Sequence, residues 1–320
     1  MSSGFQAFIV VLLCAREASA TLNNISNCYN LTGNEVLTAL ILRSSLSFVS
    51  LILGLPVVAL WIVRTCTSRK PVKDTDRLIT YISIATMLYA STQSLQWLHI
   101  SASHAYCSAL GAIIEYISLS VLVLTACVGF HLSLLIRQTR CLKVAPEGTV
   151  AYRRQEIAYL LLTTLLPLLL IPWPFFFDLY GDSGAWCWIK SADQECKPIP
   201  KGVVLSFVLY YAWAAVLLPY AVVIISVVLA ILCFRKAQRP HSSVCALLGY
   251  MVIFTLTTIA SGVGGAMLWR DPSSYGYLLV QTLSEPAFTM LSNVLVCAYM
   301  CWSQYSSRPV YKYYGLEHES

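Results

Sequence analysis

The chain has 320 residues, of which 58% are hydrophobic and 11% are charged, and its formal net charge is +6. Soluble domains carry roughly 25% charged residues, so this composition excludes a water-soluble globular protein and predicts an integral membrane protein. The positive charge favours contact with anionic membrane lipid and cytosolic partners, and no basic cluster interleaved with aromatic residues indicates a nucleic-acid partner.

The first apolar run, residues 5–14, is too short to cross a bilayer, whose hydrocarbon core requires roughly 20 residues of helix. It is followed by Ala18-Ser19-Ala20, which is typical of the small residues at a signal-peptide cleavage site. We therefore expect residues 1–20 to be a signal peptide. Because no Lys or Arg precedes the apolar run, a start that is not cleaved remains the alternative.

Seven longer apolar stretches follow, and we expect them to form a seven-transmembrane helix bundle over residues 36–301, with 302–320 as a tail. Helices are expected because lipid offers no hydrogen-bond partner to an unpaired backbone, and the alternating pattern of a membrane barrel is absent. The chain shows no internal repeat, which argues against transporter folds built from repeats. The expected spans are residues 36–63, 78–98, 107–136, 157–177, 202–234, 244–269 and 276–301.

The loops predict the orientation of this bundle. Residues 21–35 form a short segment before the first span, in which Asn24 and Asn30 begin N-glycosylation sequons that require luminal exposure. By the positive-inside rule, the amino terminus is expected outside and the carboxyl terminus in the cytosol, at the plasma membrane. The basic residues on the expected cytosolic side are Arg64, Arg69, Lys70, Lys73, Arg77, Arg137, Arg140, Lys143, Arg153, Arg154, Arg235, Lys236, Arg239, Arg308 and Lys312.

Four cysteines are expected on the oxidising side, and they allow three disulfide pairings. We favour Cys107 with Cys187, because this bond would pin the long loop 178–201 to the outer end of the third helix. Cys28 with Cys196 is then the remaining pair, and the alternative that one of these two stays free is left open.

The passage from Tyr180 to Ile189, with Trp186-Cys187-Trp188-Ile189 at its core, resembles the second extracellular loop of the cyclic-AMP-receptor-like G-protein-coupled receptors and their secretin and adhesion relatives. The run from Arg77 to Ser83 at the start of the second span, and Cys107 at the start of the third, are similar to those families too. The resemblance implies a receptor that activates a heterotrimeric G protein. The glycine-rich stretch at residues 262–265 predicts that an activating ligand moves the cytosolic end of the sixth helix outward.

Two motifs of rhodopsin-like receptors are absent, because the third span has no Asp-Arg-Tyr triplet and Ser292-Asn293-Val294 begins the stretch where Asn-Pro-x-x-Tyr would stand. The outer segment is also too short for the hormone-capturing or autoproteolytic domains of the secretin and adhesion receptors, and the sixth span lacks their proline. The ligand is therefore left unidentified.

Ionisable residues within the spans are candidates for a binding site, because a charge at mid-bilayer costs several kcal/mol. Arg43, Glu115 and Glu285 are each expected roughly 10 to 14 Å below the outer surface, at about 1.5 Å per residue. One interpretation is that they floor an outward-open ligand pocket, and the other is that Arg43 pairs with one glutamate to lock the helices. The expected remaining lining of the pocket is Gln281, Gln96, Tyr116, Trp97 and Trp213.

A second group of residues is expected to act in activation. His131 and Arg137 fall near the cytosolic end of the third span, and Asn293 is a candidate for a hydrogen bond between helices. The stretch containing Gly262, Gly264 and Gly265 is either a hinge of the sixth helix or a site of close helix packing.

Other classes of protein are less well supported by the sequence. No lysine lies in the last two spans to carry retinal, and the five histidines are scattered, so we expect no enzyme activity, metal or cofactor. A transporter or ion pathway that uses Arg43, Glu115 and Glu285 is the alternative function. The expected absence of a polar stripe through the inner half of any span counts against it.

Overall fold

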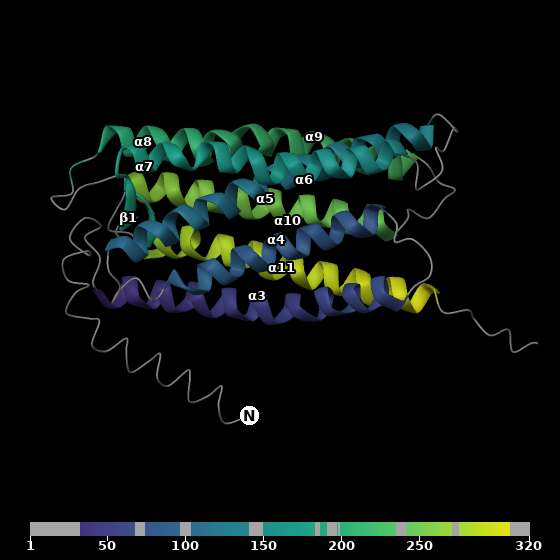
Figure 1. Ribbon diagram of the computed structural model, residues 1–320, viewed down its shortest axis with the longest axis horizontal. Helices are drawn as coiled ribbons and strands as arrows, with labels where there is room; N and C mark the ends of the chain where they lie inside the picture. The colour runs from purple at the N-terminus through teal and green to yellow at the C-terminus, as the bar shows by residue number, and fades with distance from the viewer. Residues whose placement is uncertain are drawn as a thin grey trace, which may run out of the picture.

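The computed structural model describes residues 33–67, 74–96, 104–140, 150–182, 186–190, 197, 199–234, 242–270 and 275–307. Nearly all of them are helical, and the long helices run side by side along the long axis of the molecule (Figure 1). The helices are α3 (Gly33–Thr67), α4 (Asp74–Ser94), α5 (His104–Arg140), α6 (Val150–Leu170), α7 (Pro172–Phe176), α8 (Pro200–Ser206), the π-helix η3 (Phe207–Tyr211), α9 (Ala212–Phe234), α10 (Ser242–Arg270) and α11 (Tyr275–Ser307). The expected signal peptide, Asn24, Asn30, Cys28, Trp97, Cys196 and most of the tail lie outside the described residues.

Among the described residues, five helical segments are long and apolar enough to cross a membrane, which makes the chain an all-α, multi-pass membrane protein. They are Asn34–Val63, His104–Leu135, Arg154–Phe176, Pro200–Ile231 and Val244–Gly265. Helices α4 and α11 coincide with the other two expected spans but contain more polar residues. In α4 these polar residues face inward, because Thr80, Ser83, Thr86 and Gln93 are all buried.

Two of the expected continuous helices change their geometry along their length. The span expected at 157–177 ends as α6 at Leu170, and α7 begins at Pro172, whose missing amide hydrogen is tolerated in a first turn. The span expected at 202–234 contains the wide turn η3 between α8 and α9. Such π-helical turns occur often at functional sites, and this one sets the positions of Tyr210 and Tyr211.

The packing of the helices separates a core from a lipid-facing surface. Helix α11 packs against α3, α4 and α10, and α5 packs against α4, α6, α9 and α10. Helix α6 lies at the edge of the bundle, where the side chains of Leu161, Leu165 and Leu169 are exposed. These leucines are where lipid tails are expected, because lipid solvates apolar side chains as well as a protein core does.

A β-hairpin covers one end of the bundle, which we call the hairpin end. Strand β1 (Tyr180–Asp182) pairs antiparallel with β2 (Cys187–Ile189). The predicted disulfide between Cys107 and Cys187 is confirmed, and it ties β2 to the first turn of α5. The hairpin also lies directly on α5 at Gly111, where an added Cβ would come within 3.2 Å of the Cα of Trp188. The sequence thus folds its long loop inward onto the helices.

Candidate functional site

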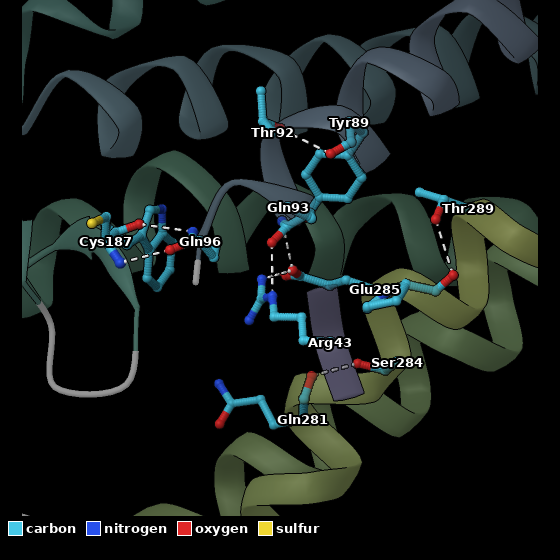
Figure 2. Close-up of polar contacts among 12 residues, drawn as sticks. Arg43, Tyr89, Thr92, Gln93, Gln96, Cys187, Gln281, Ser284, Glu285 and Thr289 are labelled. Carbon is cyan, nitrogen blue, oxygen red and sulfur yellow. Dashed lines mark hydrogen bonds and ion pairs between the residues drawn. The ribbon is translucent and has the colours of Figure 1, made fainter. Parts of the chain in front are cut away.

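An ion pair between α3 and α11 lies in the half of the bundle near the hairpin. The Arg43 guanidinium donates from Nη2 to Glu285 Oε2, and from Nε to Gln93 Oε1 at 2.7 Å. The Gln93 amide closes the group by donating to Glu285 Oε2 at 3.0 Å (Figure 2). Arg43 is only 4% exposed and Gln93 is fully buried, whereas the Glu285 side chain is 22% exposed. Three helices, α3, α4 and α11, are joined through one buried polar group.

Two small cavities adjoin this ion pair. The first, of about 30 Å³, is lined by Arg43, Glu285, Gln96 and Gln281 together with aromatic side chains of the hairpin and η3. The second, of about 40 Å³, continues toward apolar side chains of α5, α10 and α11. A water molecule needs roughly 10 to 15 Å³ of such space, so each cavity has room for about two to four waters. The residues shared by both linings are Tyr89, Ser118, Tyr210, Ser261 and Glu285.

The third ionisable residue, Glu115, lies elsewhere. It is fully buried on α5 and accepts a hydrogen bond at Oε2 from the indole N–H of Trp188. Its other oxygen, Oε1, has no hydrogen-bond partner among the described residues, and Glu115 is not part of either cavity lining. Arg43 and Glu285 thus meet at the cavity, whereas Glu115 does not line it and is bonded to Trp188, which does.

The expected lining is partly found in the structure. Gln96 and Gln281 line the first cavity. Tyr116 does not, because its hydroxyl donates to the backbone oxygen of Thr164 on α6 at 3.4 Å. Trp213 is also excluded, since its side chain is 36% exposed on α9.

Aromatic residues that the sequence did not single out line the cavity instead. Trp186 and Trp188 flank the disulfide, and the Arg43 guanidinium lies 5.1 Å from the centroid of the Trp186 ring. The Trp188 ring meets the rings of Tyr210 and Tyr211 edge to face, at 5.9 and 6.0 Å. The position of both tryptophans beside Cys187 was a usable signal, because a disulfide that pins a loop also pins its neighbours.

Asn293 of α11 forms the predicted hydrogen bonds between helices, to α3 and α4. Its amide nitrogen donates to the backbone oxygen and the hydroxyl of Ser50 on α3, both at 3.1 Å. Its oxygen accepts from Thr86 at 3.0 Å and from Ser83 at 3.4 Å, both on α4. With Thr80, these α4 residues form a buried polar line below Gln93, which corrects the expectation that no span carries such a stripe.

Polar contacts also join the helices at the end opposite the hairpin. His131 on α5 is buried, and its Nε2 lies 3.5 Å from Thr75 Oγ1 on α4. Arg77 and Tyr81 of α4 both bond the carboxylate of Glu156 on α6, at 3.0 and 2.6 Å. The backbone of Arg137 is helical within α5, and its side chain lies outside the described part of the chain.

A further contact at this end joins α4 to α11. The hydroxyl of Tyr299 donates to a carboxylate oxygen of Asp76, and both residues are buried. Neither residue was singled out from the sequence. Asp76 precedes Arg77 at the start of an apolar run, where an acidic residue is ordinarily a solvated helix-start residue.

The glycines of α10 differ in their surroundings. A Cβ added at Gly264 would lie 2.9 Å from the backbone nitrogen of Gln281, so α10 and α11 touch there. A Cβ at Gly265 would lie 3.5 Å from the Gln281 amide nitrogen, whereas one at Gly262 would meet nothing within 4 Å. Close packing therefore accounts for Gly264 and leaves Gly262 unexplained.

The fold and the site together define an all-α, multi-pass membrane protein with a buried ion pair beside a small cavity under a disulfide-anchored hairpin. No protein-family model matches the chain, and a search of curated proteins finds no match. Among the described residues, no three His, Cys, Asp or Glu side chains gather closely enough to hold a metal ion. The polar contacts described at the site are one ion pair and hydrogen bonds.

Proposed function

We propose that the chain is a seven-transmembrane receptor of the plasma membrane that couples to a heterotrimeric G protein. The observation that supports this most is the hairpin, which Cys107–Cys187 anchors above a cavity containing the Arg43–Glu285 ion pair. This arrangement suits a receptor because a ligand in the cavity would contact several helices at once. The resemblance of the hairpin sequence to the cyclic-AMP-receptor-like receptors is in accord with the proposal.

The proposal assigns the hairpin end to the outside and the opposite end to the cytosol. The basic residues of the sequence support this assignment, since most of them fall in the segments expected on the same side as Arg77. All seven expected spans, including α4 and α11, then cross the membrane. The polar faces of α4 and α11 suit such a position because they are buried against each other and not presented to lipid.

In this proposal, the cytosolic contacts hold the receptor inactive. Tyr299–Asp76 and Arg77–Glu156 join α11 to α4 and α4 to α6 at the ends of the helices. The hydrogen bond of 3.0 Å between Thr125 and Tyr250 joins α5 to α10 farther inside. Separation of α10 from α5 would require this bond to break, which makes it a candidate switch between closed and open helix ends.

Nucleotide exchange on added G-protein α subunits, measured in membranes that contain the chain, tests the proposal. We expect nucleotide exchange above that of empty membranes with at least one class of subunit. The Tyr250→Phe variant is expected to give a different exchange rate from that of the unaltered chain. Surface delivery of each variant is measured in parallel, because a retained protein would also give no signal. Equal exchange with and without the chain, for every subunit class, would contradict the proposal.

A transporter or ion pathway is the second candidate, and the buried polar line of α4 favours it. Gln93, Thr86, Ser83 and Thr80 continue inward from the ion pair, with Asn293 beside them. A chain of buried hydroxyl and amide groups is what a proton or ion path requires. Flux of protons or small ions in proteoliposomes, abolished by Glu285→Gln, would favour this function over the receptor.

A further inference from the structure

The charges that line the cavity are already matched to each other. Arg43 contributes one positive charge and Glu285 one negative charge, and they are in direct contact. A charged ligand would either add an unbalanced charge to the site or have to separate this pair first. Both routes cost several kcal/mol, because a buried ion without its partner loses its hydration without compensation.

Hydrogen-bonding positions, by contrast, remain available on both Arg43 and Gln281. The bonds of the Arg43 guanidinium use Nε and Nη2, and Nη1 has no partner among the described residues. The side-chain amide of Gln281 also has none in the described part of the chain, and in Figure 2 this side chain extends away from Ser284 with no dashed line at its amide. Both residues line the first cavity. The groups without a partner are thus the Nη1 donors of Arg43 and the amide nitrogen and oxygen of Gln281.

The two cavities give the site a polar end and an apolar end. Arg43 and Gln281 belong only to the first cavity, whereas Leu122, Phe254 and Phe288 belong only to the second. The cavities share Glu285 and four other residues in their linings, so they adjoin each other. Their volumes of about 30 and 40 Å³ are small beside the roughly 150 Å³ of an apolar cavity that holds benzene.

From these observations we infer that the site binds a small uncharged molecule with a carboxamide-like or hydroxyl head and a short apolar tail. The head lies between Arg43 Nη1 and the Gln281 amide, and the tail lies toward Phe254 and Phe288. This inference deepens the proposed function, since it names the ligand class of the same cavity. Glu115 takes no part, because it lines neither cavity and is bonded to Trp188.

A matched set of probes tests the charge requirement on the purified full-length chain in lipid nanodiscs. Propionamide is uncharged, propionate is an anion, propylammonium is a cation and β-alanine is a zwitterion, all of similar size. Binding is titrated by ligand-observed NMR, which detects small ligands that bind weakly. We expect propionamide to bind at least tenfold more tightly than the three charged probes.

Two variants and a control locate the binding. Gln281→Met removes the free amide and Arg43→Lys removes Nη1 while keeping the positive charge, and each is expected to weaken propionamide binding about tenfold. Ser226→Ala is the control, since its hydroxyl bonds only its own helix at Val222, and it leaves binding unchanged. Thermal unfolding of each variant without probe verifies that it is folded.

Three outcomes overturn the inference: tighter binding of any charged probe, unchanged propionamide binding in the variants, or no propionamide binding, which would mean that the cavities hold water only. The measurement uses no G protein. Propionamide binding without nucleotide exchange would therefore contradict the proposed receptor function and support the inferred ligand class. Nucleotide exchange without propionamide binding would support the receptor function and contradict the ligand class.

Discussion

Gln96 holds Cys187 by both of its backbone groups. Its amide oxygen accepts from the Cys187 N–H at 2.9 Å, and its amide nitrogen donates to the Cys187 carbonyl at 3.3 Å. Because Gln96 follows the end of α4 and Cys187 is bonded to α5, this pair fixes the hairpin to two helices. The covalent bond alone would leave the hairpin free to rotate about one point.

Gln96→Leu is therefore expected to loosen the hairpin without breaking the disulfide. The substitution leaves two buried backbone groups unpaired, at about 1 to 3 kcal/mol each. Hydrogen exchange of residues 180–190, measured by mass spectrometry in nanodiscs, should become faster in the variant. Gln96→Glu, which keeps the acceptor for the Cys187 N–H, should show a smaller increase, and equal protection in all three proteins would contradict the role of Gln96.

The close approach of α10 and α11 at Gly264 gives a prediction with an internal control. Gly264→Ala places a methyl group 2.9 Å from the Gln281 backbone, so the helices must separate and thermal stability should fall. Gly262→Ala adds the same methyl group where nothing lies within 4 Å, and it should be neutral or gain about 1 kcal/mol from helix propensity. Thermal unfolding of the two variants checks this difference. A Gly262→Ala protein that is stable and delivered but inactive would instead support the hinge.

Asn293 and its neighbour Ser292 form a similar pair on α11. Both are fully buried, but Asn293 bonds α3 and α4, whereas the Ser292 hydroxyl has no partner among the described residues. We expect Asn293→Ala to destabilise the protein by about 1 to 2 kcal/mol and Ser292→Ala to have little effect. Thermal unfolding in the same lipid provides the comparison, and an equal loss in both would mean that packing and not hydrogen bonding matters there.

The long apolar helices could be predicted from the sequence because a membrane span needs only length and low charge. The direction in which a residue faces could not, since lipid and protein core are both apolar and helical periodicity carries little information in a bilayer. Tyr116 and Trp213 were placed in the cavity for this reason, and they face α6 and the exterior. Charged residues gave a stronger signal, because lipid does not solvate Arg43 and Glu285.

Neutral polar residues were missed for a related reason. Gln93 completes the ion pair, yet a single amide in an apolar run does not reveal its partners. The break before Pro172 and the π-helix at Tyr210 were also missed. The proline stretch could have predicted the first of these, and nothing in the local sequence predicts the second.

Removal of the Tyr299 hydroxyl tests whether the Tyr299–Asp76 contact, here called the cytosolic lock, holds the receptor inactive. Tyr299→Phe keeps the ring and deletes the hydroxyl that donates to Asp76, so the closed helix ends should lose stability relative to open ones. Under the proposed function, basal nucleotide exchange should rise severalfold. Tyr277→Phe, on the same helix at the hairpin end, is the control because its hydroxyl makes no hydrogen bond within the described residues, and a rise in both variants would contradict the lock.

Because Arg43 and Glu285 form a pair, the stabilities of the two single variants and the double variant are expected not to be additive. Replacing one partner leaves the other charge buried without compensation, so Arg43→Met and Glu285→Leu should each lower the stability by about 3 to 5 kcal/mol. The double variant removes both charges and should be more stable than either single one, because it also removes the cost of desolvating them. Chemical or thermal unfolding of the four proteins gives the coupling directly, and additive losses would contradict a direct pair. If the double variant is stable and reaches the cell surface but no longer responds, the pair serves ligand binding or activation, whereas an unchanged response would show that it acts only to hold α3 against α11.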